Sequence, residues 1–169
     1  MTFPADTLNG QLENLAAHPF YKGRLPASVV DAADFAANTP LMGRSDLVAE
    51  MENPGYGAFG GTNPVRMNLS PMGASLVPAM QTAGDMANMI AAARTHLDAC
   101  GVGPGDVCAV TFGYHMFVAG LFYQSQMEAH GVACIPLGPG EAERTVDVCT
   151  KHNVTVLAGK PSFLLKMID

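Results

Sequence analysis

The residues best suited to bind a small molecule stand directly after two apolar runs of strand length. They are Tyr114, His115, Met116 and Phe163. An aromatic wall with one polar ring suits an aryl carboxylate, because apolar area supplies affinity and a few polar groups fix orientation. The structural alternative is that His115 caps a helix and that Tyr114 packs on a neighbouring element. We expect these four residues to line an apolar crevice.

Polar side chains near Phe163 add little catalytic chemistry. Lys160 could meet a substrate anion, although a solvated surface lysine is its commoner role, and Ser162 stands at a helix start, where serine is a capping residue. No Gly-x-Ser-x-Gly motif occurs and no Ser/His/Asp order stands out, so nothing indicates nucleophilic catalysis. The five histidines and four cysteines show no metal-ligand spacing. The sequence therefore predicts no metal site.

The elements that position these residues alternate between helix and strand from Thr82 onward. The first helix should begin after Thr82, and further helices are expected at 114–130, at 141–152 and from Pro161 on. Apolar runs predict strands at Val107–Phe112, Val132–Pro136 and Val154–Leu157. This order is typical of an α/β fold with a parallel sheet. The carboxyl ends of parallel strands share one edge, so the loops that carry the candidate residues should open to the same side.

The chain before this region has a different pattern. Short helices are expected at 8–15, at 28–38 with Ser28 as its cap, and at 45–51 with Ser45 as its cap. Residues 53–64 are rich in Gly, Pro and Asn, which is typical of a linker or mobile loop. A turn of small residues is expected at 70–75. We therefore predict two regions, a helical arm with linker at 1–65 and an α/β subdomain at 66–169.

Composition excludes several function classes. Net charge is −6 with no basic run, which argues against a nucleic-acid partner. The apolar stretches are too short to cross a bilayer, and the N-terminus lacks signal-peptide features, so we expect a cytoplasmic protein with no membrane partner. The cysteines form no Cys-x-x-Cys pair and are expected to be buried and reduced. Because 49% of residues are hydrophobic and only 14% are charged, we expect an apolar patch and a homodimer formed through residues 1–52.

The order of the segments resembles the N-terminal portion of the phenylacetate–coenzyme A ligase branch of the adenylate-forming enzymes. The resemblance rests on HPFYKGRL at 18–25, PLMGRSDLVAE at 40–50, a Gly-rich loop, and above all Gly101–Leu165 with its closing Pro-Ser-aromatic. It implies that ATP activates an aryl or other carboxylic acid as an acyl-adenylate, and that coenzyme A then takes the acyl group. ATP, Mg²⁺ and coenzyme A are the implied cofactors of the parent enzyme, and a homodimer agrees with the resemblance.

One motif departs from the family pattern. The family carries a Ser/Thr/Gly-rich phosphate loop that ends in Gly-Lys-Pro, and the corresponding place here is Asn68–Pro78. Such a loop needs free backbone N–H groups, hydroxyls and usually a lysine. The residues that remain suitable are Ser70, Gly73 and Ser75. Because Pro71 removes one donor and no lysine lies in the loop, the resemblance implies a degenerate phosphate loop.

The length of the chain also bears on its activity. Members of the family are several times longer, and the parts that hold adenine, ribose and magnesium, with the C-terminal lysine, would follow Asp169. We therefore expect an N-terminal fragment of an acyl/aryl-CoA ligase that is inactive alone and has no bound cofactor. The alternative is a non-catalytic interaction or acyl-binding module derived from the same family. The sequence after Asp169 discriminates between them, and neither the acid nor the acceptor can be named from these residues.

Overall fold

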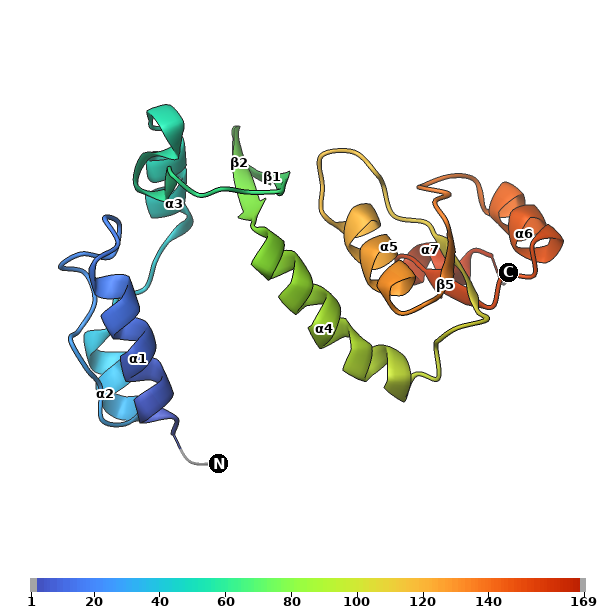
Figure 1. Ribbon diagram of the computed structural model, residues 1–169. Coiled ribbons are helices and arrows are strands. Elements are labelled where there is room, and N and C mark those ends of the chain that lie inside the picture. Colours follow the sequence, from blue (N-terminus) through green and yellow to red (C-terminus); the bar gives the residue numbers. More distant parts are fainter. Residues whose placement is uncertain (1–2, 168–169) are drawn as a thin grey trace. The chain divides into compact units, whose positions relative to one another are not determined.

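The chain divides into two units, which are described separately below (Figure 1). The computed structural model describes residues 3–167. Unit 1 contains the chain up to Thr62 together with Pro71–Val77, and unit 2 contains Asn63–Ser70 and the chain from Pro78 onward. The outer limits of the two predicted regions, residues 1 and 169, lie outside the described residues. Within 3–167, no helix has both the length and the apolar character needed to cross a bilayer.

Unit 1 is built from short helices. They are α1 (Ala5–Ala16), α2 (Ala32–Asn38), α3 (Arg44–Met51) and the 3-10 helix η1 (Pro54–Phe59). The predicted caps Ser28 and Ser45 were wrong. At α2 the Asp31 side chain accepts from the Asp34 amide, and at α3 the Gly43 amide donates to Asp46 at 2.8 Å. At both helix starts a carboxylate, and not the predicted serine, accepts a hydrogen bond from a backbone amide.

Aromatic contacts hold the segment that was expected to be a linker. Phe59, at the end of η1, packs on Phe20 and on His18 with ring centroids 5.0 and 5.4 Å apart. The Asn9 side chain also bonds both backbone groups of Val29, accepting at 2.8 Å and donating at 3.0 Å. Residues 53–59 therefore pack as part of unit 1.

Strands β1 (Arg66–Met72) and β2 (Ser75–Gln81) form a two-stranded sheet. The turn between them lies at Gly73 and Ala74, and Gly73 has a φ of 67°, which glycine adopts without strain. The sequence predicted a turn over 70–75. Instead, Ser70 and Ser75 both lie within strands, because the ladder continues almost to the glycine.

Unit 2 contains a three-stranded parallel sheet of order β4-β3-β5. Its elements are α4 (Ala83–Ala99), β3 (Val107–Val110), α5 (Ala119–Ala129), β4 (Ala133–Ile135), α6 (Ala142–Lys151), β5 (Val156–Ala158) and α7 (Pro161–Leu165). Cys108 on β3 stands in register with Cys134 on β4 and with Val156 on β5. The predicted α/β class and the parallel direction of all three strands are confirmed. The predicted last helix ends at Leu165, and residues 168 and 169 lie outside the described range.

The core of unit 2 lies around β3. Cys108 and Val110 are fully buried and pack with Leu97 of α4 and Met127 of α5. The helix α4 begins at the predicted cap, since Thr82 accepts from the Asp85 amide at 3.2 Å and its own amide donates to Asp85 at 2.8 Å. The sheet is thus covered by amphipathic helices whose positions follow from their apolar spacing.

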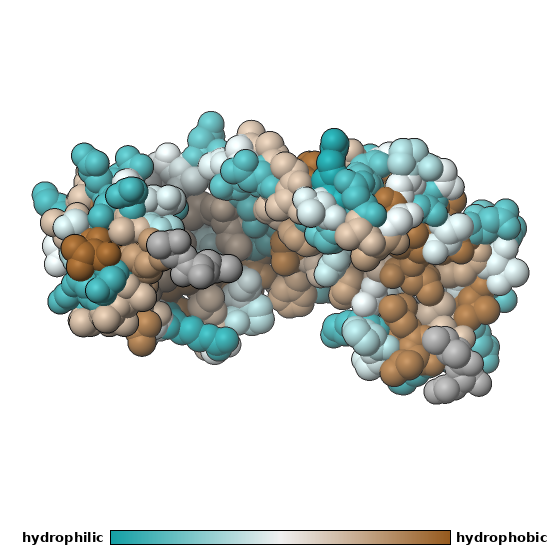
Figure 2. Space-filling model, turned by 90° about the horizontal axis from the view of Figure 1, so that it is seen from below, coloured by the Kyte–Doolittle hydropathy of each residue, from teal (hydrophilic) through white to brown (hydrophobic). Residues whose placement is uncertain are grey.

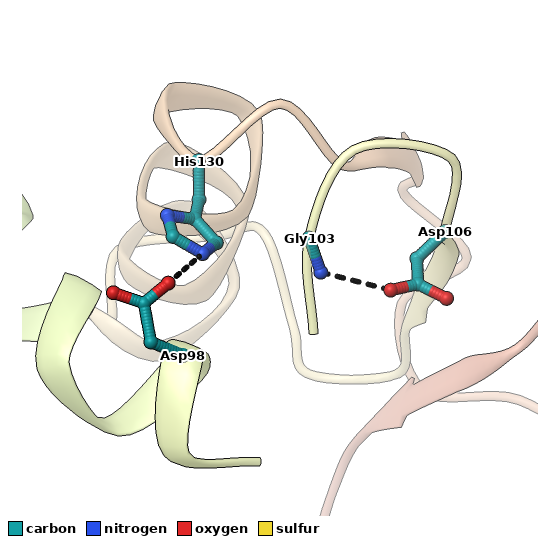
Figure 3. A network of polar contacts seen from close by, with 4 residues as sticks. All are labelled: Asp98, Gly103, Asp106 and His130. Atoms are coloured by element: carbon teal, nitrogen blue, oxygen red, sulfur yellow. Dashed lines mark hydrogen bonds and ion pairs between the residues drawn. The ribbon is translucent and has the colours of Figure 1, made fainter. Parts of the chain in front are cut away.

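Polar contacts fix the turn that leads into β3 (Figure 3). The Gly103 amide donates to Asp106 at 2.8 Å. The Thr155 hydroxyl, which the figure does not draw, donates to the other oxygen of that carboxylate at 2.8 Å. These two bonds, the first above all, lower the pKa of Asp106. Asp98 at the end of α4 pairs with His130 after α5 at 3.1 Å. The turn therefore ties the starts of β3 and β5 together.

Helix α5 begins later than the sequence predicted. The pattern favoured a helix from residue 114, but α5 starts at Ala119. The carbonyl oxygens of Met116 and Phe117 accept hydrogen bonds from Asn68 and Leu69 of β1, so these residues are held out of a helix. The segment 113–118 consequently remains irregular.

Hydrophobic side chains gather on the visible face of unit 2 (Figure 2). The large apolar residues of unit 2 that remain exposed include Val146, Leu157 and Leu165. An exposed apolar surface of this kind is typical of a binding or contact region. The expectation of an apolar patch therefore has a counterpart on this unit.

Candidate functional site

A cavity of about 410 Å³ opens at the carboxyl ends of the strands in unit 2. It is lined by Thr111, Phe112, Gly113, His115, Phe117, Ala119, Pro139, Gly140, Lys160 and Phe163. These residues come from the chain that follows β3, from the loop after β4 and from the chain that follows β5. The cavity thus lies where ligands gather in parallel sheets.

The wall of the cavity is aromatic. Phe112, Phe117 and Phe163 line it together with His115, whose ring meets Phe117 edge-on with centroids 4.9 Å apart. The His115 ring lies against the backbone of Gly113, where an added Cβ would come within 2.5 Å of Nε2. Glycine at 113 therefore lets the imidazole take this position. The dimensions and lining suit a small molecule with one ring.

The structure brings two of the four predicted pocket residues together. His115 and Phe163 line the cavity, whereas Tyr114 and Met116 do not. Residues 113, 115 and 117 line the cavity and residues 114 and 116 do not, within a segment that is irregular and bends at 115–118. The cavity therefore contains two of the four expected residues, and a role in ligand binding stays a prediction for all of them.

Tyr114 packs against the core of unit 2. Its hydroxyl is buried and has no hydrogen-bond partner among the described residues. Burial, followed by the nearby thiols of Cys134 and Cys108 and the carboxylate of Glu128, raises the pKa of Tyr114 to about 12. The side chain thus contributes to packing under the cavity.

Lys160 is the charged side chain that lines the cavity, and no carboxylate lines it. Within residues 3–167 Lys160 forms no ion pair, so its ammonium group is available to an anion. Behind it, the Thr111 hydroxyl donates to the Ala158 carbonyl at 3.1 Å and an added Cβ on Gly159 would collide with this hydroxyl. Thr111 therefore contributes its apolar surface and has its polar group satisfied.

Sequence reasoning missed several lining residues. Phe117 was not among the expected residues, but it is 37% exposed and lines the cavity. Pro139 and Gly140 follow the second strand of the sheet, so the strand-end argument applied to that strand would have found them. Lys160 was identified as a residue that could meet an anion, and its position on the cavity agrees with that hypothesis.

The residues of the predicted phosphate loop lie in a different setting. Ser70 lies in β1, Gly73 lies in the turn and Ser75 begins β2. The Ser75 hydroxyl donates to the carboxylate of Glu52. Residues 67–81 contain no lysine or arginine. The Ser75 hydroxyl is therefore already bonded to the Glu52 carboxylate, and no lysine or arginine lies near it in the sequence of the hairpin. For both reasons these residues do not fit a nucleotide phosphate.

The described residues also provide no evident metal centre. Within 3–167, no group of three or more His, Cys, Asp or Glu side chains lies close enough to hold a metal ion. The four cysteines are free thiols, and burial raises the pKa of the Cys108 thiol to about 12. Such a thiol is protonated at neutral pH and is not a ready metal ligand. The cavity must therefore be interpreted from its aromatic wall and its lysine.

The chain is similar to known CoA ligases in sequence and in fold. No family model matches the chain. A phenylacetate–coenzyme A ligase from Pseudomonas putida is 27% identical over 137 residues, which cover 79% of this chain and 30% of that protein. A 2-hydroxyisobutyryl-CoA ligase, solved in an open conformation with 2-HIB-AMP and CoA, matches 96% of this chain with a TM-score of 0.83 and 17% identity.

The same enzyme solved in its thioesterification state gives a TM-score of 0.82 at 18% identity. The chain spans 40% and 38% of these two solved chains, so it is much shorter than the relatives it matches. The chain therefore has the fold of a portion of an adenylate-forming enzyme, and its predicted resemblance to the N-terminal part of phenylacetate–coenzyme A ligase is confirmed.

Proposed function

We propose that this chain is the N-terminal portion of an acyl- or aryl-CoA ligase and that its cavity binds the acid. In the proposed parent reaction a carboxylate, ATP and coenzyme A give an acyl-CoA, AMP and pyrophosphate. The similarity to a phenylacetate–coenzyme A ligase supports this reaction class. The contribution of the chain's own residues is to bind and orient the carboxylic acid.

The observation that carries the proposal is the lining of the cavity. Three phenylalanine rings offer stacking surface to an aryl group, and Lys160 offers a positive charge to its carboxylate. No carboxylate lines the cavity, so an anion meets no like charge there. An aromatic acid therefore fits this site better than a neutral or cationic ring does.

His115 has an orienting role in this proposal. Its ring is held between the Gly113 backbone and Phe117, so it presents a polar edge in a fixed position within an apolar wall. One positioned polar group of this kind selects the orientation of a ring without supplying most of the affinity. We assign His115 to orientation and not to proton transfer.

The cofactors of the parent reaction are proposed separately from the cavity. The solved 2-hydroxyisobutyryl-CoA ligase was crystallised with an acyl-AMP and CoA, which is consistent with ATP, Mg²⁺ and coenzyme A in the parent of this chain. The residues at 67–81 do not fit a phosphate, so we assign none of these cofactors to the hairpin. When bound, ATP would activate the carboxylate that the cavity orients.

Titration of the 169-residue chain with phenylacetate, benzoate and the neutral amide phenylacetamide tests the proposal. Calorimetry or ligand-observed NMR should detect saturable binding of the acids and weaker binding of the amide by about tenfold, since a charge-assisted bond is lost. Equal affinity for acid and amide would contradict the role of Lys160. Absence of saturable acid binding at millimolar concentration would contradict the cavity assignment.

We also propose a homodimer and a cytoplasmic location for the protein. Within unit 1 the exposed apolar residues Val30, Leu41 and Met42 lie in the region 1–52 that the sequence assigned to subunit contact. Sedimentation velocity should give a dimer that Leu41→Glu converts to a monomer, because a charge in a buried contact is costly. A monomer at all accessible concentrations would contradict the proposal.

A further inference from the structure

Asn68 is a buried polar residue whose side chain donates hydrogen bonds to residues outside its own strand. It lies in β1, is 3% exposed, and its Nδ2 donates to the carbonyls of Met116 at 3.4 Å and of Phe117 at 3.2 Å. The neighbouring Leu69 amide donates to the same Met116 carbonyl at 2.8 Å. These atoms all belong to unit 2. The N-terminal half of β1 therefore holds the segment Gly113–Val118, which we call the strap.

The strap supplies one wall of the acid cavity. Gly113, His115 and Phe117 line the cavity, and the residues between them point elsewhere. Two of the strap's six carbonyls are the ones that Asn68 holds. The position of this wall therefore depends on hydrogen bonds that Asn68 of β1 donates to it.

The sequence of the strap suits another conformation. Its residues continue the helical pattern of α5, which is why the sequence predicted a helix from 114. A helix advances by about 100° per residue, so helical 114–118 would no longer place His115 and Phe117 on one side. The bonds from Asn68 and Leu69 oppose this extension by using two carbonyls that the helix would need.

We propose that Asn68 is the positioning residue of the acid cavity, because it holds the strap out of a helix, in the conformation in which His115 and Phe117 line the cavity. The proposal rests on the proposed function. Asn68 touches no ligand and acts through the strap. Its loss should lengthen α5 toward the N-terminus and remove one wall of the cavity.

A matched control lies on the same face of β1. Arg66 is two residues from Asn68, and its Nη2 donates to the Ser125 hydroxyl of α5 at 3.1 Å. That hydroxyl donates in turn to the Leu121 carbonyl at 2.7 Å. Arg66 therefore holds the body of α5, whereas Asn68 holds the strap. Substitution of Arg66 tests whether any loosening of β1 has the same consequence.

Asn68→Leu is the informative variant because it separates position from stability. The Asn68 Oδ1 is buried without a partner among the described residues, so an apolar side chain of similar size removes that unsatisfied atom together with the donor. The free energy of unfolding should thus change little. The NMR signals of the His115 ring and amide exchange at 118–121 report the strap, and titration with phenylacetate reports the cavity.

We expect Asn68→Leu to shift the His115 ring signals away from those of wild type, to protect amides 118–121, which a longer α5 would pair with carbonyls 114–117, and to weaken phenylacetate binding about tenfold. Arg66→Met should leave the phenylacetate Kd within about twofold of wild type. If Asn68→Leu does not fold, Asn68→Gln, whose longer side chain displaces the same amide, is measured in the same way and should shift the His115 signals too.

Unchanged His115 signals and an unchanged Kd in a folded Asn68 variant would overturn the proposal. An equal loss of binding in Arg66→Met would also overturn it, since the effect would then come from β1 in general. If wild type itself binds no phenylacetate, the proposed function fails. The His115 signals and amide exchange still decide the role of Asn68 in that case, because both are measured without ligand.

Discussion

The cavity at the strand ends and the β1–β2 hairpin differ in what their side chains offer a ligand. The cavity combines three phenylalanines with a lysine that has no ion pair within the described residues. The hairpin has Gly73 in its turn and one serine in each strand, Ser70 and Ser75. Ser75 already donates to Glu52. The first region has the chemistry of an acid site, whereas the second lacks the charge that a phosphate site needs.

A chain can therefore share the fold of a family and still lack one of the binding sites of that family. The backbone that positions the cavity is a parallel sheet, and its strand ends meet regardless of which side chains follow them. A phosphate loop depends on free N–H groups and a lysine at particular places, and the ladder of β1 and β2 uses backbone donors in this hairpin. We expect substitutions in the cavity to change acid binding and a substitution in the hairpin to leave it nearly unchanged.

Charge at Lys160 should give the largest effect. Lys160→Met should weaken phenylacetate binding about tenfold, and Lys160→Glu should abolish it, because a like charge then faces the carboxylate. Lys166→Met is the matched control, since Lys166 borders a neighbouring groove and not the cavity. Calorimetry of the three variants measures the effect. Equal losses of phenylacetate affinity in Lys160→Met and Lys166→Met would show that the effect comes from the total charge of the chain and not from a contact of Lys160 in the cavity.

Two aromatic residues should affect different properties. Phe163→Ala should raise the Kd for phenylacetate by roughly threefold to tenfold through lost stacking while the protein stays folded. Tyr114→Ala should instead lower the free energy of unfolding by about 3 kcal/mol, because Tyr114 packs on the core. Tyr114→Phe should raise stability, since the hydroxyl it removes is buried without a partner. Denaturant unfolding and titration together distinguish these outcomes. Loss of binding in folded Tyr114→Phe would contradict the placement of Tyr114.

The sheet beneath the cavity should lose stability at alkaline pH. Burial, with a smaller effect of Cys134, raises the pKa of Cys108 from 9.0 to about 12. A raised thiol pKa favours the neutral form in the folded state, so this contribution is complete below pH 9 and is lost as pH rises toward 12. The loss is at most about 1.4 kcal/mol per pH unit for one group.

Unfolding of Cys108→Ala between pH 8 and pH 11 checks this expectation. Its stability should fall less steeply with pH than that of wild type, although Tyr114 adds a loss of its own in the same range. Cys100→Ala is the matched control, because Cys100 is exposed, and it should follow wild type. Identical slopes for all three proteins would show that the Cys108 thiol does not contribute.

The hairpin should give the smallest effect. Ser75→Ala should leave phenylacetate binding within about twofold of wild type, because Ser75 does not line the cavity. The isolated chain should show no ATP–pyrophosphate exchange with any aryl acid, in wild type or in this variant. Exchange clearly above a control without protein would refute the account of the hairpin.

Much of the fold followed from local patterns in the sequence. Apolar runs indicated β3, β4 and β5, and Thr82 indicated the start of α4, because strand burial and helix capping are each decided by a few neighbouring residues. The capping residues of α2 and α3 were less predictable. Asp31 caps α2 and Asp46 accepts from the Gly43 amide at α3, and propensity alone does not rank these aspartates against the nearby serines.

The cavity was predictable in place but not in detail. The strand-end argument located it between the chain after β3 and the chain after β5, where His115 and Phe163 lie. The start of α5 was wrong because it depends on Asn68, which lies about fifty residues earlier in the chain than the carbonyls it bonds. Contacts over such a separation leave no local signal, so the irregular conformation of 113–118 could not be foreseen.

The most direct test of the account is where phenylacetate lies when it binds this chain. Isotope-filtered NOE measurements on the labelled chain detect which protein protons lie near the ring of the unlabelled acid. We expect NOEs from the ring to Phe117 and Phe163 and a shift of the Lys160 side-chain signals. We expect no NOE from the ring to Tyr114. Saturable binding with NOEs to other residues, and with Lys160 unperturbed, would contradict the account.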